Sequence, residues 1–375
     1  MKLLPQQTRV VLWLLFLISE CKSHENLVDD SSTEDLLNSV SPSAEISACS
    51  NLLSRSQRQL CRSHPMHLSL LEEGILRAEK LCKRLLENDR WNCYSVRTGP
   101  AGLTHTLKEG SREASFVEAL SAASMTTALA RACARGSLSD CPCEHSWPGN
   151  RPSGVENHKW EGCSLDVRAP MKFVRKFLDT DLQKSQHPSS QMTLHNYNAG
   201  RLALKLVRKL DCRCHGTSGS CTFKTCYKRF GTFEEIGQHI LKRYRNARHV
   251  HMNATHSWVE VENGPNSINS LTENRAVVKH LPHLRRHAKQ RIKRRDLIFV
   301  SNATDYCNYD PAQGSLGTAG RRCTEENAEY LCCGRGYVEK FEIKRDYCHC
   351  RFTNGCCNLV CKTCYTPVKF GSCND

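Results

Sequence analysis

The sequence predicts an α+β fold, in which a helical N-terminal domain with disulfide-pinned hairpin loops is followed by a small disulfide-rich β-hairpin domain. Cysteine is abundant, with 24 in 375 residues, and eleven of these fall in the last 69 positions. Apolar residues recur at helical spacing before residue 245, whereas the C-terminal part contains short extended runs. The apolar content of 39% suffices for a core, but the C-terminal part has too few large apolar residues for one, so disulfides must replace it.

Residues 1–23 predict a secretory signal peptide. Lys2 and Arg9 accompany the apolar stretch 10–18, and small residues follow it, which places cleavage after residue 21 or 23. The alternative is an N-terminal core helix. A nine-residue apolar stretch is too short to span a bilayer, and no later stretch approaches eighteen residues. We therefore expect a secreted protein with oxidised cysteines and no metal site.

The segment after the expected signal peptide is acidic, whereas the chain as a whole is basic. Residues 24–48 are acidic, Ser-rich and free of aromatic residues, which predicts a disordered extension. The whole chain carries a formal charge of +15. A basic secreted protein is expected to bind anionic surfaces such as sulphated glycans, and its compartment argues against nucleic acid.

The predicted helical domain covers residues 49–245. Its clearest element is the Ala-rich stretch 113–133, which contains no Pro or Gly and predicts a buried helix. A loop rich in Gly, Pro and Cys follows from Cys141 to Cys163. Apolar periodicity predicts further helices at 70–88, 171–182, 195–210 and 233–244.

The cysteine-rich stretch 212–226, CRCHGTSGSCTFKTC, predicts a cross-linked hairpin. Its first two cysteines are two positions apart, so they project from one face of an extended strand. Gly216 and Gly219 allow positive φ, which suits a tight reversal. The pattern places the hydroxyl of Ser218 in solvent at the tip.

Several interpretations compete for Ser218. Serine is an ordinary turn residue, so loop filler is the simplest. A four-cysteine zinc site lacks the usual C-x2–4-C pairs. A hydrolase nucleophile requires Gly two positions later, where Ser220 stands, and His215 is too close in sequence to be an obvious catalytic partner. We predict no catalytic residue, and modification of Ser218 remains the third chemical possibility.

Residues 246–305 predict a polar and basic linker without cysteine. Asn253 and Asn302 begin glycosylation sequons. A basic patch lies near the end of this linker, and it is either a glycan-binding site or a solvated charged loop. The paired arginines of the patch could also be cut by a dibasic-specific protease. The patch comprises Lys279, Arg285, Arg286, Lys289, Arg291, Lys293, Arg294 and Arg295.

Residues 306–375 predict long hairpins that disulfides staple together. Extended runs occur from Tyr337 to Arg345 and from Val360 to Lys369. Two pairs of cysteines are adjacent in sequence, at 332–333 and 356–357. An adjacent pair either closes a strained ring or reaches outward to two different strands.

A series of motifs resembles the Wnt family of secreted, lipid-modified signalling glycoproteins, in the family's order from about Cys49 to Cys373. The signature is Cys212-Arg213-Cys214-His215-Gly216-Thr217-Ser218-Gly219-Ser220-Cys221. The others are Arg90-Trp91-Asn92-Cys93, Glu113-Ala114-Ser115-Phe116, Trp160-Glu161-Gly162-Cys163, Leu194-His195-Asn196, Ala199-Gly200-Arg201 and Cys332-Cys333-Gly334-Arg335-Gly336-Tyr337.

The resemblance implies a non-enzymatic ligand that needs no cofactor. In the family, the serine matching Ser218 carries a monounsaturated fatty acyl group that enters a groove on the cysteine-rich domain of a Frizzled receptor. His215, Gly216, Thr217 and Gly219 would flank that contact. A second contact would come from a C-terminal hairpin tip at about Phe352 to Leu359, with an adjacent-cysteine disulfide between Cys356 and Cys357.

The resemblance also implies partners and a location. The partners are a Frizzled-type receptor, an LRP-type co-receptor, a membrane-bound O-acyltransferase, a lipid-binding export carrier and heparan sulphate proteoglycans. The protein would occupy the extracellular space and matrix and associate with membranes through its lipid. A secreted heparin-binding matrix protein without receptor activation is the alternative, and a hydrolase is the third hypothesis.

Disulfide pairs carry over from the family residue by residue. The implied pairs are Cys82–Cys93, Cys133–Cys141, Cys143–Cys163, Cys212–Cys226, Cys214–Cys221, Cys307–Cys333, Cys332–Cys373, Cys348–Cys364, Cys350–Cys361 and Cys356–Cys357, with Cys49–Cys61 as the remaining N-terminal pair.

This chain departs from the family at several positions. Ala328 stands where the family has a cysteine, so we predict that its partner there, Cys323, is unpaired or cross-links another chain. Gly355 replaces an aromatic residue at the hairpin tip, which would weaken or redirect that contact. Thr217 replaces an apolar residue and Tyr227 replaces Trp, and we expect both to leave acylation intact.

Overall fold

The structure is a computed structural model of the full chain, and it describes residues 53–99, 101–138, 141, 158–160, 166–222, 224–261, 292–302, 304–353 and 358–375. These residues belong to one unit, Asn51–Asp375. The expected signal peptide, the acidic extension and the sequence from 262 to 291 lie outside the described residues. None of the described helices is long and apolar enough to cross a membrane.

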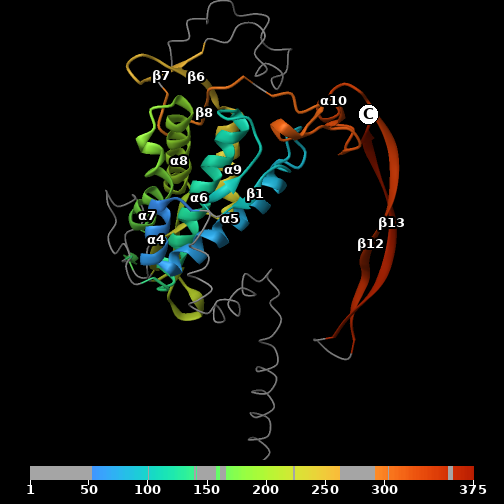
Figure 1. The fold of residues 1–375 in the computed structure, drawn as a ribbon. Helices are drawn as coiled ribbons and strands as arrows, with labels where there is room; N and C mark the ends of the chain where they lie inside the picture. Colours follow the sequence, from blue (N-terminus) through green and yellow to red (C-terminus); the bar gives the residue numbers. More distant parts are fainter. Residues whose placement is uncertain are drawn as a thin grey trace, which may run out of the picture. The chain divides into compact units, whose positions relative to one another are not determined.

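The N-terminal part is a bundle of helices, as predicted (Figure 1). Pro65 starts the second of them in the first helical turn, where its missing N–H costs no hydrogen bond. The bounds are α4 Arg55–Ser63, α5 Pro65–Leu85, α6 Arg112–Ala134, α7 Arg168–Asp179, α8 Pro188–Leu206 and α9 Phe233–Arg245.

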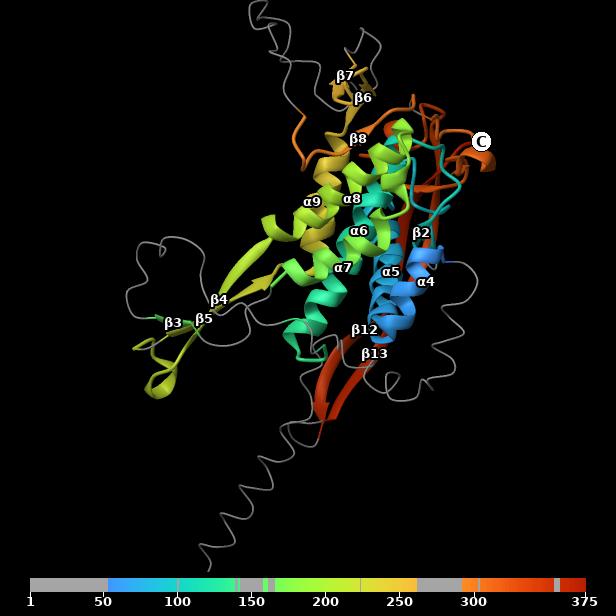
Figure 2. The ribbon, with the colours of Figure 1, turned by 60° about the vertical axis from the view of Figure 1, so that its left-hand side comes forward.

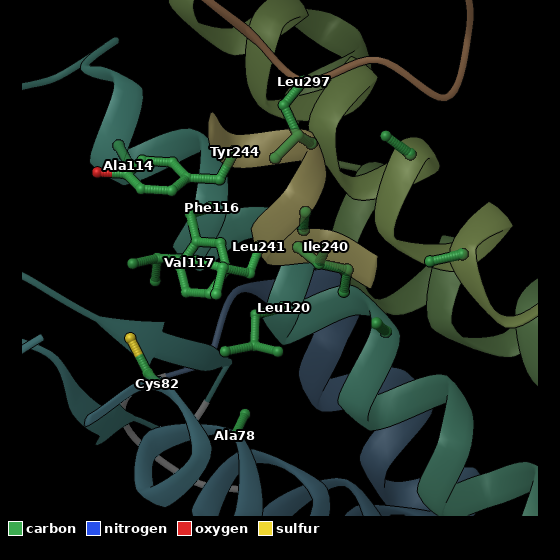
Figure 3. Packing of buried hydrophobic residues seen from close by; sticks show 14 of the residues in the cluster. Ala78, Cys82, Ala114, Phe116, Val117, Leu120, Ile240, Leu241, Tyr244 and Leu297 are labelled. Atoms are coloured by element: carbon green, nitrogen blue, oxygen red, sulfur yellow. The ribbon is translucent and has the colours of Figure 1, made fainter. Parts of the chain in front are cut away.

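Helix α6 is the centre of this bundle, because its Ala, Ser and Thr residues let neighbouring helices approach closely. A Cβ on Gly200 of α8 would lie 2.0 Å from the Ala119 carbonyl oxygen, and one on Gly74 of α5 would lie 2.9 Å from that of Ser124. Around it, Phe116, Leu120 and Tyr244 join α6 to α9 in the main core (Figure 3). The Ala-rich sequence is therefore a packing requirement as well as a helix signal.

A buried ion pair joins two further helices. Arg201 of α8 donates from Nη1 and Nη2 to the two carboxylate oxygens of Asp179 in α7, over 2.9 and 2.8 Å. The Arg201 side chain is only 1% exposed. A bidentate pair of this kind fixes orientation as well as distance, which accounts for the arginine in the Ala199-Gly200-Arg201 motif.

The helix predicted at 195–210 ends earlier than expected. Helix α8 stops at Leu206, and residues 208–214 form strand β4 instead. Leu210 is therefore a strand residue and 39% exposed, not part of a buried helical face. Antiparallel pairing of β4 (Arg208–Cys214) with β5 (Lys224–Phe230) overrides the helical periodicity.

The segment predicted as a surface linker, 246–305, is built into the fold at both ends. It contains β6 (Arg248–Met252), β7 (Trp258–Glu260) and β8 (Ile298–Phe299), and β8 runs parallel to β6. Asn196 holds β8 by donating from Nδ2 to the Ile298 carbonyl (3.0 Å) and accepting the Ile298 N–H (3.1 Å). These stretches therefore contain short strands, and Ile298 is buried although the local sequence pattern gave no sign of it.

The C-terminal part is mostly one long hairpin, β12 (Tyr337–Thr353) against β13 (Asn358–Cys373) (Figure 1). Strand β11 (Arg322–Cys323) pairs with the end of β13. Among the described residues of this C-terminal part, the one buried hydrophobic cluster is small. It is formed by Cys323, Ala328, Leu331, Cys332 and Cys373. The expectation that disulfides replace a core here is consistent with this. The short elements nearby are β9 Tyr309–Asp310, β10 Ser315–Leu316 and α10 Ala328–Leu331.

Arginines join the C-terminal part to the helical part. Arg321 donates to the carbonyl oxygens of Glu87, Asp89 and Arg90, over 2.7 to 2.8 Å, just beyond the end of α5. Arg90 in turn donates to the Tyr330 carbonyl (2.8 Å) and lies over its ring. These contacts satisfy carbonyls that follow a helix terminus. The predicted domain boundaries at 245 and 306 remain predictions.

Candidate functional site

The predicted hairpin at 212–226 is present and carries two cross-links. Cys212 lies opposite Cys226 in the register of β4 and β5, and their disulfide joins Cα atoms 4.1 Å apart. Cys214 bonds Cys221 nearer the tip, with Cα atoms 4.6 Å apart. Strand β3 (His158–Trp160) pairs parallel to β5. Figure 2 shows β4 and β5 as a hairpin that leaves α8 and returns to α9.

The turn itself is a single 3-10 turn over Thr217–Gly219. The Gly219 N–H donates to the Gly216 carbonyl (3.0 Å), and the Ser220 N–H donates to that of Thr217 (3.2 Å). Gly219 has the expected positive φ, 79°. Gly216 does not: its backbone is extended, and glycine is needed because a Cβ would lie 2.1 Å from the Ser220 hydroxyl oxygen.

Ser218 occupies the left-handed region, with φ 57° and ψ 28°. This conformation is uncommon for a residue with a Cβ and persists where surrounding structure enforces it. Its side chain is exposed, and no described residue forms a hydrogen bond with its hydroxyl. The tip therefore presents a free primary hydroxyl on a backbone that two disulfides and two turn hydrogen bonds hold in place.

His215 does not act on this hydroxyl. Its Nε2 is hydrogen-bonded to the Thr225 hydroxyl on β5, at 2.7 Å. The imidazole therefore braces the two strands below the tip. Nucleophilic catalysis needs the histidine to bond the serine and a third group to orient the histidine, so the geometry does not support the hydrolase hypothesis.

The second predicted contact region lies at the far end of β12 and β13. Phe352 pairs with Leu359 across the strands, and both are exposed, at 66% and 54%. Cys348–Cys364 and Cys350–Cys361 cross-link the hairpin just below, where the register shifts between Cys348 and Arg351. Gly355 and the Cys356–Cys357 prediction lie outside the described residues.

The structure forms eight of the implied disulfides within its described residues. They are Cys82–Cys93, Cys133–Cys141, Cys212–Cys226, Cys214–Cys221, Cys307–Cys333, Cys332–Cys373, Cys348–Cys364 and Cys350–Cys361. Cys61 is also disulfide-bonded. Its expected partner Cys49, and the Cys143–Cys163 pair, lie outside the described residues.

Cys323 is a free cysteine and is only 2% exposed. Its sulfur lies within 4.8 Å of those of Cys332 and Cys373, which bond each other. Burial raises the pKa of the Cys323 thiol, which makes it a poor nucleophile. The unpaired state agrees with the prediction, and burial argues against a cross-link to another chain.

Three residues of the predicted basic patch, Lys293, Arg294 and Arg295, are described, and all are exposed. The other five lie outside the described residues. Sequence reasoning missed that Arg295 lies near Lys242 and Arg243 of α9, where burial and all three cations lower the pKa of His239. The basic last turn of α9, Lys242 to Arg245, was the available signal.

The two sequons differ in exposure. Asn302 is exposed, as an acceptor asparagine should be. Asn253 is half-buried in the β6–β7 turn. The Asn253 Oδ1 accepts hydrogen bonds from the Thr255 N–H (3.1 Å), the Thr255 hydroxyl (2.8 Å) and the Ser257 N–H (2.8 Å). Glycan occupancy at both remains a prediction.

Fold and site together define a class: a disulfide-stabilised protein that displays two cross-linked hairpins, the first with an exposed serine at its tip. The profile described as "wnt family" matches residues 49–374. The chain therefore belongs to the Wnt family, whose members are secreted, non-enzymatic signalling ligands.

Individual relatives agree with this assignment. The chain is 32% identical to Protein Wnt-2b-A of Xenopus laevis over 332 residues, covering 87% of this chain and 88% of the relative. It is 33% identical to human Protein Wnt-2b over 332 residues, covering 87% and 79%. A solved structure described as human WLS in complex with WNT8A matches with a TM-score of 0.53 and 26% identity, over 83% of this chain and 94% of that one.

Proposed function

We propose that this Wnt family signalling ligand binds the cysteine-rich domain of a Frizzled-type receptor through a monounsaturated fatty acyl group on Ser218. The observation that carries the proposal is the free, exposed hydroxyl of Ser218 on a doubly cross-linked tip. A preformed tip avoids an ordering cost on binding. His215, Gly216, Thr217 and Gly219 would surround the acyl attachment and contact the receptor.

The acyl chain would supply most of the affinity. Burying hydrocarbon contributes ~0.8 kcal/mol per CH₂, so a dozen buried methylenes contribute on the order of 10 kcal/mol. The same chain would cling to membranes when exposed. A membrane-bound O-acyltransferase would therefore attach it, and a lipid-binding carrier of the WLS kind would shield it during export.

A second receptor contact would come from the tip of the β12–β13 hairpin. Phe352 and Leu359 form an exposed apolar pair at its described end, and exposed aromatic side chains of this kind commonly anchor interfaces. Cys356 and Cys357 would complete the tip. An LRP-type co-receptor would complete the signalling complex at the cell surface.

The alternative is a heparin-binding matrix protein without receptor activation. The exposed cations Lys293, Arg294 and Arg295 favour glycan binding under both hypotheses. Heparan sulphate proteoglycans would then hold the protein in the extracellular matrix.

Removing the Ser218 hydroxyl tests the receptor hypothesis. The Ser218→Ala variant should lose the acyl group and nearly all affinity for a Frizzled cysteine-rich domain. Ser220→Ala, an exposed hydroxyl two positions away on the same tip, is the matched control and should bind normally. A Ser218→Ala protein that binds the receptor as tightly as the parent chain rules out the acyl mechanism.

A further inference from the structure

The outer edge of β12 is a long, open strand edge. In the order β11–β13–β12, β12 is the last strand, and its outer side has no strand partner among the described residues. The strand spans 17 residues. Unpaired backbone N–H and C=O groups along such an edge readily pair with another extended chain. Short edge strands, proline, bulges or charges of one sign normally prevent this. Tyr337 to Cys348 pair with β13 without a register shift, and the charges on this edge are of both signs.

The side chains along this edge alternate in a self-complementary pattern. On one face, residues 340, 342, 344 and 346 read Lys-Glu-Lys-Asp, and on the other, residues 341, 343, 345 and 347 read Phe-Ile-Arg-Tyr. All eight are exposed, and three of them are large apolar side chains: Phe341 at 71%, Ile343 at 71% and Tyr347 at 76%. Three large exposed apolar side chains on one face of an edge strand indicate an interaction surface.

We propose that β12 pairs with β12 of a second copy of this chain, antiparallel, about a two-fold axis through Ile343. In this register Lys344 lies opposite Glu342 of the second copy, and Asp346 lies opposite its Lys340. The two-fold axis repeats both ion pairs, so the edge gains four opposite-charge pairs. On the other face, Ile343 meets its own copy, and Arg345 lies opposite the Phe341 ring.

Neighbouring registers are disfavoured by charge. Residues that lie opposite each other in an antiparallel pair have their side chains on the same face. The two-fold axis therefore always passes through a residue, and the neighbouring registers move it to the next residue on either side. An axis through Glu342 would place Glu342 against itself and Lys344 against Lys340. An axis through Lys344 would place Lys344 against itself and Glu342 against Asp346. Like charges directly opposite are destabilising, and the pattern therefore selects one register.

The charged residues have partners in the monomer that they can exchange at low cost. Lys344 pairs with Asp346 at 3.0 Å and Glu342 pairs with Arg322 at 2.6 Å, and all four side chains are more than half exposed. Exposed pairs of this kind contribute little. The register also brings Thr353 of the second copy level with Cys333, beside the turn at Gly334, whose Cβ position has no atom within 4 Å. Space is therefore open at that point.

Charge reversal followed by charge exchange tests the pairing. Sedimentation equilibrium of the full chain, in a density-matched nonionic detergent that shields any lipid, should show a concentration-dependent dimer. Lys344→Glu alone and Glu342→Lys alone should each raise its dissociation constant about tenfold or more, because two pairs become repulsive. The double variant restores opposite charges and should dimerise like the parent chain. A parent chain that stays monomeric at roughly 100 μM overturns the proposal, as does a double variant no better than the singles.

A cysteine at the axis tests the register independently. Ile343→Cys would face its own copy with Cα atoms ~4.5–5.5 Å apart, within the range for a disulfide, and should form a covalent dimer after mild oxidation. Tyr347→Cys is the matched control: it is equally exposed but eight positions out of register with its copy, and should not cross-link. Equal cross-linking at both positions, or none at 343, contradicts the two-fold axis.

Discussion

Glu118 is a half-buried carboxyl whose protonation should be measurable in the stability of the helical bundle. Its two oxygens accept hydrogen bonds from Asn196 Nδ2 (2.8 Å) and the Thr193 hydroxyl (2.7 Å). Burial raises the pKa of Glu118 from 4.5 to about 7, against the effect of these two hydrogen bonds and with a smaller contribution from the nearby charge of Glu109. The folded protein therefore favours the protonated form.

The rise in the pKa of Glu118 sets the size of its effect on the free energy of unfolding. At ~1.36 kcal/mol per pKa unit, the change from 4.5 to about 7 corresponds to about 3 kcal/mol of free energy of unfolding. The unfolded chain holds fewer protons than the folded one between these values, so stability falls as pH rises through this window. The contribution is fully present below pH 4.5 and lost above about pH 7.

Glu118→Gln should remove this pH dependence, because a neutral amide replaces the carboxyl at every pH. Its oxygen can accept from Asn196, and its NH₂ can donate to the Thr193 hydroxyl, whose single proton is then directed to the Ser189 carbonyl (3.0 Å). Between pH 5 and 8, the parent chain should lose about 2–3 kcal/mol more than the variant. Urea unfolding with disulfides intact measures this difference. Glu326→Gln, an exposed carboxyl, is the control, and equal pH dependence of the parent and Glu118→Gln proteins would refute the reasoning.

Three further predictions concern other parts of the molecule. Arg201→Met leaves Asp179 buried without its partner and should cost ~3–5 kcal/mol, whereas Lys172→Met on the exposed face of α7 should cost less than ~0.5 kcal/mol; similar thermal midpoints would contradict the buried-pair assignment. Ala328→Cys, in the same small C-terminal cluster as Cys323, should form a disulfide with Cys323. Alkylation in denaturant should then find one reactive thiol in the parent chain and none in the variant. Finding no thiol in the parent chain would show that Cys323 is bonded. Phe352→Ala should weaken Frizzled binding about fivefold or more, and Tyr309→Ala, at an equally exposed aromatic, should not; equal losses would remove the hairpin tip from the interface.

Local sequence pattern predicted the elements that local physics determines. The Ala-rich stretch 113–133 became α6, Arg112–Ala134, because nothing in it interrupts a helix and Ser111 caps its start by accepting the Ala114 N–H. The hairpin at 212–226 followed from its cysteine spacing and glycines. The extended runs at 337–345 and 360–369 became the cores of β12 and β13, which extend further because disulfides hold the hairpin together.

Elements fixed by distant contacts were not predictable in this way. The short strand β8 is held by Asn196, about a hundred positions earlier, and by parallel pairing with β6. Strand β4 continues the helical periodicity of α8 and becomes extended only because β5 pairs with it. At the candidate site, the positive φ of Ser218 and the tight packing around Gly216 depend on the folded turn. The glycines in the sequence indicated only that this turn could adopt positive φ.

The most direct test of the central claim is peptide mass spectrometry of the secreted protein. Cleavage after Arg213 and Lys224 isolates the tip with Ser218, Ser220 and two other hydroxyl residues. We predict that this peptide carries the mass of one monounsaturated fatty acyl group, that fragmentation assigns the group to Ser218, and that the group persists in Ser220→Ala. A secreted, receptor-binding protein whose Ser218 is unmodified would contradict the account.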